Sequence, residues 1–259
     1  MKHISYSELK IWNDCPYKHK LIYIDKIKEF LGNEYTAFGK AIHDTCERIL
    51  LSTEEVADLN VHFETRFLDE LKKLEKNDVE LRKDLIMDMR KQGNSLVEFI
   101  LPEVKNYFND YKVVSVEEKL YEDIEDHDYK FKGYIDLVLK TSDGKYHVID
   151  WKTCSWGWNS KKKSDRMITY QLTLYKSFYA KKHNINPENI ETYFALLKRT
   201  AKKDRVEIFR VTSGAKKTEN ALNLMNKSIY NILNNRYYKN RLSCTANYGC
   251  EFYKTQYCE

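Results

Sequence analysis

The stretch that decides the fold runs from Tyr129 to Thr153 and reads YKFKGYIDLVLKTSDGKYHVIDWKT. Residues 131–139 and 145–151 are rich in aromatic and β-branched side chains, which favours two strands. Between them, Thr141-Ser142-Asp143-Gly144 is typical of a hairpin turn. The sequence therefore predicts an antiparallel β-hairpin.

Each strand of this hairpin carries one acidic residue, Asp136 or Asp150. Because side chains alternate along a strand, Asp150 and Lys152 share a face and Trp151 points the other way. A two-residue Asp-Gly loop would place Asp136 opposite Trp151. A three-residue loop over 142–144, with its glycine left-handed, would place Asp136 opposite Asp150. Such loops are common, and we expect this one.

Two carboxylates that face each other repel, and burial increases the cost unless a cation lies between them. A hard divalent ion such as Mg²⁺ takes carboxylate oxygens together with waters and substrate phosphates. Lys152 beside them could meet a phosphate or position a water. Taken singly, Asp136 is explained as a surface residue and Asp150 as a strand-end charge. The combination D-x13-D-x-K across a hairpin favours a metal-dependent site instead.

Composition sets the class of the protein. The 259 residues include 44 basic and 39 acidic side chains, a net charge of +5, which is compatible with nucleic acid without indicating it. The chain has no run of 18 apolar residues, and MKHISYSELKIW lacks the apolar core of a signal peptide. We expect a reducing, cytoplasmic compartment. Six cysteines there indicate metal or cluster binding, or plain burial, rather than disulfides.

The remaining pattern predicts alternating helices and strands. We expect a first helix that begins after a Ser5 or Ser7 N-cap and stops near Asn13-Asp14-Cys15-Pro16. Further helices are expected over 38–51, over 54–108 with candidate breaks at Asn77-Asp78 and Leu101-Pro102, over 165–182 and over 218–234. Strands are expected over 111–121, 191–198 and 206–211. In the strand over 111–121, Glu117 and Glu118 lie on opposite faces, so one of them could point toward the aspartates.

Two helices carry candidate site residues. Phe38, Ile42, Cys46 and Ile49 form an apolar stripe at helical spacing, which makes Cys46 a core residue. His43 lies beside this stripe, where a lone histidine is more typically structural. On the helix over 165–182, Gln171 and Tyr175 are four residues apart and therefore share a face.

Two basic segments could either contact nucleic acid or simply face solvent. The loop over 154–159 holds Trp156 and Trp158 and leads into Lys161–Lys163. It could stack a base and hold phosphates, or it could be a solvated loop with tucked aromatics. The turn over 199–205 carries four basic residues against one acid. It is either a solvated hairpin tip or a contact to a duplex backbone.

The tail holds Cys244, Cys250 and Cys258 within 15 residues. Three thiols do not complete a tetrahedral site, so a fourth ligand must come from elsewhere. Cys15 is the candidate, because it ends a predicted helix beside a proline. A [4Fe–4S] cluster or a zinc ion would then join the two ends of the chain. Unrelated free thiols are the alternative.

These residues together carry a family resemblance from Ser5 to Cys258. In order they are Ser5-x-Ser7 with Cys15-Pro16, Gly39-x3-His43, Gly133-x2-Asp136, Ile149-Asp150-x-Lys152-Thr153, Gln171-x3-Tyr175 and the terminal cysteines. The chain resembles the PD-(D/E)XK nuclease superfamily. Within it, the chain is most similar to the RecB-like exonucleases, the CRISPR-associated Cas nucleases and the phage recombination exonucleases that carry an iron–sulfur cluster.

The resemblance implies a single α/β domain with a restriction-endonuclease-like core, in which helices flank a central mixed β-sheet. Its parts would be a helical insertion over about 54–108, a nuclease core over about 111–212 and a cysteine-bearing lobe from 1–30 and 236–259. It implies that Mg²⁺ or Mn²⁺ is bound by His43, Asp136, Asp150 and the Trp151 carbonyl, and that Lys152 is catalytic. Gln171 and Tyr175 would line the site and contact DNA or support the lysine.

For the cysteines, the resemblance implies that Cys15, Cys244, Cys250 and Cys258 bind a [4Fe–4S] cluster, with zinc as the alternative. Helicase–nuclease members often show Cys-x2-Cys before the last cysteine, and here that position is Tyr253. The wider spacing is similar to phage members. The family's second-strand glutamate matches either Glu117 or Glu118.

The implied function is that of a metal-dependent DNA exonuclease in phage or bacterial DNA recombination, repair or processing. DNA is the expected partner, and no association with a membrane is expected. A homo-oligomer, or a complex with a recombination protein or a helicase, is also compatible with the resemblance. A PD-(D/E)XK endonuclease and a catalytically silent DNA-binding subunit are the alternatives. The intact Asp-x-Lys argues against the silent subunit.

Overall fold

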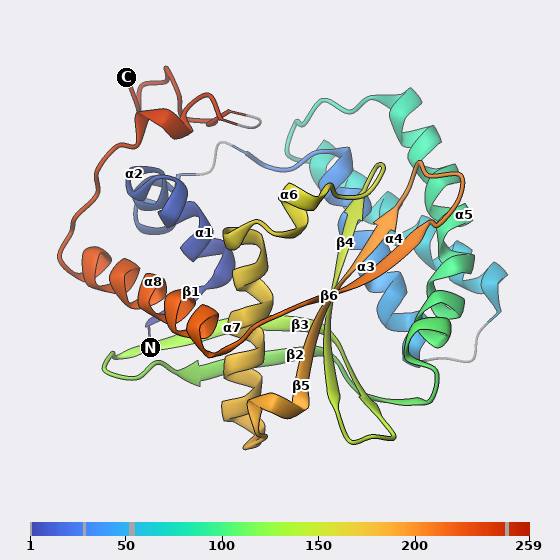
Figure 1. The fold of residues 1–259 in the computed structure, drawn as a ribbon. Helices are drawn as coiled ribbons and strands as arrows, with labels where there is room; N and C mark the ends of the chain where they lie inside the picture. Colours follow the sequence, from blue (N-terminus) through green and yellow to red (C-terminus); the bar gives the residue numbers. More distant parts are fainter. Residues whose placement is uncertain (1, 28–29, 52–54, 247–248) are drawn as a thin grey trace. The chain divides into compact units, whose positions relative to one another are not determined.

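The computed structural model describes residues 2–27, 30–51, 55–246 and 249–259 (Figure 1). The first residue of the helical region expected over 54–108 lies outside these ranges. The chain forms two compact units. The terminal unit comprises Met1–Phe30, Leu120–Gly133 and Gly214–Glu259, and the central unit comprises Leu31–Lys119 and Tyr134–Ser213.

The sheet is mixed, as the sequence predicts. Its strands are β1 (Lys2–Ser5), β2 (Tyr111–Asp123), β3 (Tyr129–Thr141), β4 (Tyr146–Cys154), β5 (Ile190–Lys198) and β6 (Val206–Val211). They pair in the order β1-β3-β4-β5-β6, with β2 also paired to β3. The β1–β3 and β4–β5 pairs are parallel, and the β3–β4 and β5–β6 pairs are antiparallel. The expectation of an α/β fold with helices flanking a mixed sheet is therefore confirmed.

The hairpin of β3 and β4 has the three-residue loop expected from its sequence. The Thr141 N–H donates to the Lys145 carbonyl at 3.1 Å, which leaves residues 142–144 as the loop. Gly144 has φ +84°, the left-handed conformation that closes such loops. The ladder pairs Lys140 with Tyr146 and ends at Leu137 and Ile149, so Asp136 and Asp150 occupy the next opposed position.

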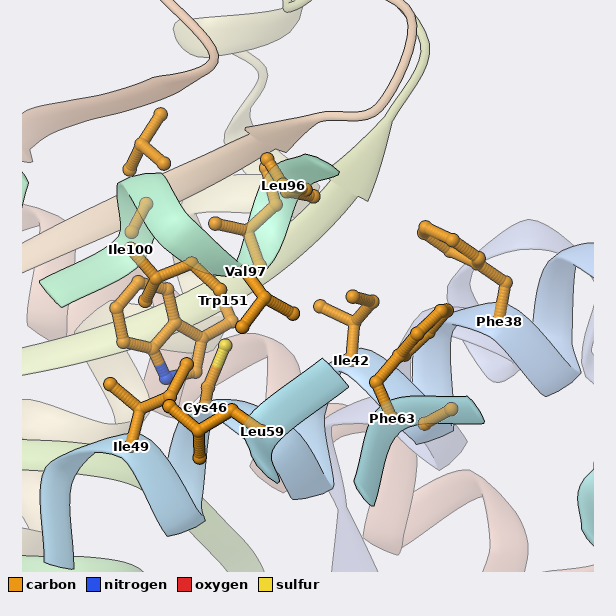
Figure 2. Close-up of a cluster of buried hydrophobic side chains, with 14 of the residues drawn as sticks. Phe38, Ile42, Cys46, Ile49, Leu59, Phe63, Leu96, Val97, Ile100 and Trp151 are labelled. Carbon is orange, nitrogen blue, oxygen red and sulfur yellow. The ribbon is translucent and has the colours of Figure 1, made fainter. Parts of the chain in front are cut away.

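One face of the sheet in the central unit is covered by α3 (Glu34–Leu51), α4 (Val56–Glu75) and α5 (Lys83–Phe108). Figure 2 shows Phe38, Ile42, Cys46 and Ile49 in one cluster with Trp151, and all five side chains are buried. Cys46 is thus a core residue, as its helical spacing predicts.

The predicted break at Asn77-Asp78 is confirmed, because α4 ends at Glu75 and Asp78 has φ +57°. The second predicted break is wrong, because α5 continues through Pro102 to Phe108. A proline removes one backbone hydrogen bond from a helix. Here Ile100, Val104 and Phe108 are buried on both sides of it, and this packing holds the helix together.

The opposite face of the sheet is covered by α7 (Arg166–His183), which packs against β4 and β5. Asp165 caps its first turn by accepting from the Ile168 N–H, and Asn184 ends it in the left-handed conformation. A short helix, α6 (Ser160–Lys163), precedes it. Because α7 links the parallel strands β4 and β5, it is the crossover helix that such strands require.

In the terminal unit, α1 (Tyr6–Asp14) begins after Ser5, whose side chain accepts from the Glu8 N–H. The expected Ser5 N-cap is therefore confirmed, but the sequence did not indicate that residues 2–5 form β1. The other elements of this unit are α2 (Pro16–His19), a π-helical turn (Lys20–Ile24), α8 (Ala215–Leu233) and a 3₁₀ turn (Arg241–Ser243). Another 3₁₀ turn (Pro187–Asn189) lies in the central unit.

Among the described residues, no helix combines the length and the apolar character that crossing a membrane requires.

Candidate active site

The two aspartates of the hairpin lie where the β3–β4 ladder stops. Asp150 is only 1% exposed. Asp136 is half-buried, and its Oδ2 accepts a 2.7 Å hydrogen bond from the Trp151 N–H. This carboxylate thus takes the place of a strand partner for the Trp151 N–H. Two acids are thereby held on adjacent strands in a largely water-excluded position.

The two aspartates affect each other's charge, and Lys152 is the cation beside them. Burial raises the pKa of Asp136, and the charge of Asp150 raises it further, whereas Lys152 lowers it. Lys152 Nζ forms an ion pair with Asp150 Oδ2, so Asp150 and Lys152 share a face as predicted. Trp151 points into the core on the other face.

His43 reaches the same position from α3. Its Nδ1 lies 3.5 Å from Asp136 Oδ2. Burial lowers the pKa of His43 to about 4, with a further lowering by Lys152 that outweighs the raising effect of Asp150. The imidazole is therefore neutral at pH 7, which is the form that can bind a metal ion.

Gln171 and Tyr175 lie on the face of α7 that meets Asp150, which confirms the prediction that they share a face. Gln171 Nε2 donates to Asp150 Oδ1 at 2.6 Å and to the Tyr175 hydroxyl oxygen at 3.2 Å. Burial raises the pKa of Tyr175, and Asp150 raises it further, so the phenol stays protonated. Asp150 is thus held from the helix side by an amide.

Of the two adjacent glutamates on β2, Glu117 faces the site. Glu118 accepts from Lys182 and, at 3.0 Å, from His183 Nε2 on α7. Glu117 has φ +51°, which interrupts the inside–outside alternation of the strand. Its carboxylate lines an open hollow together with His43, Asp44 and Glu47. Partial burial and the charges of Glu47, Asp150 and Asp44 raise the pKa of Glu117.

Asp44 and Glu47 were not identified from the sequence. Both lie on α3, and with Lys40 and His43 they recur at intervals of three to four residues, which places them on one helix face. This spacing was a usable signal once His43 was suspected. Asp44 also accepts from His62 Nε2 at 2.6 Å and from Arg66 at 2.8 Å, so its orientation is fixed.

The donor set suits a hard divalent cation. In the part of the chain that the structure describes, no three His, Cys, Asp or Glu side chains are close enough together to hold a metal ion. Lys152 instead provides the positive charge at Asp150. The buried Asp150 Oδ2 nevertheless has no hydrogen bond of good geometry to the described residues. A divalent ion that replaced Lys152 there would keep a positive charge at this oxygen and relieve the repulsion between the two aspartates.

The family of the chain follows from its sequence as a whole. The model of the PD-(D/E)XK nuclease superfamily matches residues 3–258. This chain belongs to the PD-(D/E)XK nuclease superfamily. PD-(D/E)XK nucleases generally use divalent metals such as Mg²⁺, in agreement with the oxygen-rich donor set at the end of the β3–β4 ladder.

Two solved structures are similar to this chain, and the first of them supports the fold. A crystal structure of a candidate exonuclease from Eubacterium rectale is 12% identical, has a TM-score of 0.57, and the match covers 95% of this chain and 86% of that chain. The structure of SSO0001 is 20% identical, with a TM-score of 0.39 and coverage of 83% of this chain and 92% of that chain. No protein with a curated function matches the sequence.

In this PD-(D/E)XK chain, all six cysteines are free thiols. The terminal unit brings four of them to the wall of one small hollow: Cys15, Cys244, Cys250 and Cys258. Cys15 Sγ accepts from the Asn240 N–H at 3.4 Å, and Cys244 Sγ donates to the Asn240 carbonyl at 3.9 Å. Among the residues described, these thiols do not form a group of three arranged to hold one metal ion.

The hollow lies between the two ends of this PD-(D/E)XK chain. Leu21, Phe252 and Cys258 form a small buried cluster. The Tyr17 hydroxyl donates to the Tyr257 carbonyl at 3.2 Å, and Lys18 pairs with Glu251 at 2.6 Å. The N-terminal and C-terminal segments are therefore packed together by ordinary contacts as well.

Proposed function

We propose that this chain is a divalent-metal-dependent DNA exonuclease of the RecB-like branch, with a role in phage or bacterial DNA recombination, repair or processing. The observation that carries the proposal is the register of the β3–β4 hairpin. It sets Asp136 opposite Asp150, beside the imidazole of His43 and on the same strand face as Lys152.

In this proposal, Mg²⁺ or Mn²⁺ is held by His43, Asp136, Asp150 and the main-chain carbonyl of Trp151. A divalent ion so bound lowers the pKa of a coordinated water and neutralises charge on the scissile phosphate. The neutral state of His43 supports its assignment as a ligand. The ion pair of Asp150 Oδ2 with Lys152 agrees with a cation at this oxygen.

The protein groups then have distinct roles. Lys152, released from Asp150, orients the attacking water or stabilises negative charge on the pentavalent phosphorus in the transition state. Gln171 holds Asp150 in the orientation that the reaction needs, and the protonated Tyr175 supports Gln171. Glu117 faces the same hollow and adds a further carboxylate at the site.

Exonuclease activity is preferred over the two alternatives. The name of the Eubacterium rectale protein agrees with it. A site-specific endonuclease would use the same core, so the form of the DNA substrate must separate the two activities. A silent DNA-binding subunit would not need the aspartates and Lys152 together, and here all of them are in place.

We also propose that Cys15, Cys244, Cys250 and Cys258 bind a [4Fe–4S] cluster, with zinc as the alternative. Support comes from the four thiols that line one hollow between the packed ends of the chain. The role of this site would be structural, because thiolate-bound clusters and zinc ions stabilise the folded segments that supply their ligands.

The test is a nuclease assay with end-labelled linear DNA and covalently closed circular DNA, in Mg²⁺, in Mn²⁺ and with chelator. We expect the wild type to release nucleotides from linear DNA only, and Asp150→Asn and Lys152→Ala to be inactive. Asp143→Asn changes an exposed carboxylate of the same hairpin and should remain active. Cleavage by Asp150→Asn at the wild-type rate contradicts the assignment, and cutting of circles favours the endonuclease.

A further inference from the structure

The loop that follows β4 presents an exposed aromatic ring. The chain has four tryptophans. Trp12 and Trp151 are buried and Trp158 is half-buried, but Trp156 is 77% exposed. No hydrogen bond, ion pair or ring contact joins the Trp156 side chain to the described residues. A solvent-facing indole ring is an apolar surface that stacking could cover.

The residue before Trp156 is fixed to the turn between β5 and β6. The Ser155 carbonyl accepts from the Thr200 N–H at 3.2 Å and from Thr200 Oγ1 at 2.7 Å. The Ser155 hydroxyl accepts from Arg199 Nη2 at 3.1 Å. Three hydrogen bonds therefore hold the start of the loop.

The residues after Trp156 are fixed as well. Gly157 has φ +117°, and a Cβ there would lie 3.2 Å from Lys198 Cδ, so this position favours glycine. Trp158 packs edge-on against Phe194 and Phe209, with ring centroids 5.2 and 6.2 Å apart. Because both flanks are anchored, Trp156 is held in the exposed position, which reduces the entropy lost when a ligand binds.

Four exposed lysines lie in the segments next to Trp156. Lys161 and Lys162 follow it in α6 and are exposed, and neither forms an ion pair with the described residues. Lys202 and Lys203 lie in the turn that Thr200 fixes to Ser155, and both are exposed. An aromatic platform beside a basic groove is the combination that binds single-stranded nucleic acid without sequence preference.

We infer that Trp156 stacks on a base of single-stranded DNA and that these lysines contact its phosphates. Trp156 lies four positions after Lys152, so their Cα atoms are at most about 14 Å apart. The ring is therefore within a few nucleotides of the reacting phosphate. This inference rests on the proposed function, and it names unpaired DNA as the substrate bound beside the site.

Intrinsic fluorescence tests the inference, because Trp156 is the one strongly exposed tryptophan of the four. The full chain is titrated with a twelve-residue oligothymidylate in Ca²⁺, and gels verify that the DNA stays intact. We expect quenching in the wild type. Trp156→Phe should lose the quenching but bind within about threefold of the wild type, since the ring still stacks. Trp156→Ala should bind about tenfold more weakly.

Leu242→Ala, which removes another strongly exposed apolar side chain, is the matched control and should bind like the wild type. The inference is overturned if the wild type does not bind the oligonucleotide, if Trp156→Ala binds as tightly as the wild type, or if Trp156→Phe is quenched as strongly. Loss of the proposed nuclease function is scored separately, as absence of Mg²⁺-dependent cleavage by the wild type. Binding and quenching in Ca²⁺ do not depend on that result.

Discussion

Gln171 Nε2 donates a 2.6 Å hydrogen bond to Asp150 Oδ1, the carboxylate oxygen that does not face Lys152. The two oxygens of Asp150 therefore have different partners, an amide on one side and an ammonium group on the other. The amide restricts the rotation of the carboxylate, so the second oxygen would keep its direction if Lys152 moved away, as the proposed function requires.

We expect Gln171→Ala to reduce nuclease activity about 10- to 100-fold, the usual effect of removing a group that orients a metal ligand. The apparent affinity for Mg²⁺ should fall as well, which a Mg²⁺ titration of the initial rate measures. Tyr175→Phe keeps the ring and loses only the hydroxyl that accepts from Gln171, so its effect should be smaller. Equal metal affinity in Gln171→Ala and the wild type would refute the positioning role.

Asp136→Asn should stabilise the metal-free protein at pH 7. The pKa of Asp136 is raised above 3.8 in the folded state, so the folded protein binds this proton more tightly than the unfolded chain. Stability therefore decreases as the pH rises from about 4 through the raised pKa. Each pH unit between the unfolded-state pKa and the raised folded-state pKa lowers the free energy of unfolding by about 1.4 kcal/mol. Urea unfolding of both proteins with chelator, at pH 4 and pH 7, measures the difference.

The same pair of proteins should respond oppositely to metal. A ligand that binds only the folded state at 100 times its Kd adds about 2.7 kcal/mol of stability. Mg²⁺ should therefore raise the Tm of the wild type and have little effect on Asp136→Asn. Equal shifts in both proteins would mean that Asp136 is not a metal ligand.

Gly144→Ala should lower stability by about 1–2 kcal/mol, because φ +84° is unfavourable for a residue with a Cβ. Beyond its two chain neighbours, no atom of the described residues lies within 4 Å of the added methyl group, so the hairpin register and the specific activity of the folded protein should not change. Gly144→Asn should be less destabilising, since asparagine tolerates the left-handed region. Thermal unfolding and nuclease rates of the two variants check this.

Gly93→Ala should destabilise the central unit although alanine favours helices. A Cβ at Gly93 would lie 2.1 Å from Phe63 Cζ, so α4 and α5 would have to move apart. We expect a loss of about 1–3 kcal/mol. Phe63→Leu, combined with Gly93→Ala, should recover part of it. Gly214→Ala, where nothing lies within 4 Å, is the control. A neutral Gly93→Ala would show that the contact is looser than described.

Anaerobically purified protein should be brown if the cysteine hollow binds a [4Fe–4S] cluster. Cys250→Ser should lose the colour and unfold at a lower temperature. Cys154→Ser, outside the hollow, should keep the colour and the unfolding temperature of the wild type. Metal analysis of the purified protein distinguishes a cluster from a zinc ion. Colourless protein with one zinc ion per chain would support the zinc alternative, and protein with neither metal would contradict both.

The hairpin could be predicted because its information is local. The loop over 142–144 fixes the register, and the register decides which face each aspartate occupies. The apolar stripe of α3 could be predicted for the same reason, because helical spacing is also local information. The strand bounds also agree to within a few residues, and β6 matches its predicted range of 206–211.

The features that were missed depend on partners distant in the sequence. β1 has four residues and pairs with Tyr129–Lys132, so nothing near it in the chain marks it as a strand. Pro102 is tolerated only because α5 is buried on both sides of it. The choice between Glu117 and Glu118 depends on the positive φ of Glu117, which strand periodicity does not reveal.

The ion pair between Lys152 and Asp150 has a consequence for the order of assembly. An internal ammonium group acts as counter-ion to the most deeply buried acid of the described residues, so we expect the central unit to fold without metal. Under the proposed function, loading with the divalent ion would then be a later and reversible event. A chelator should then switch the enzyme off and leave its folded architecture ready for reactivation.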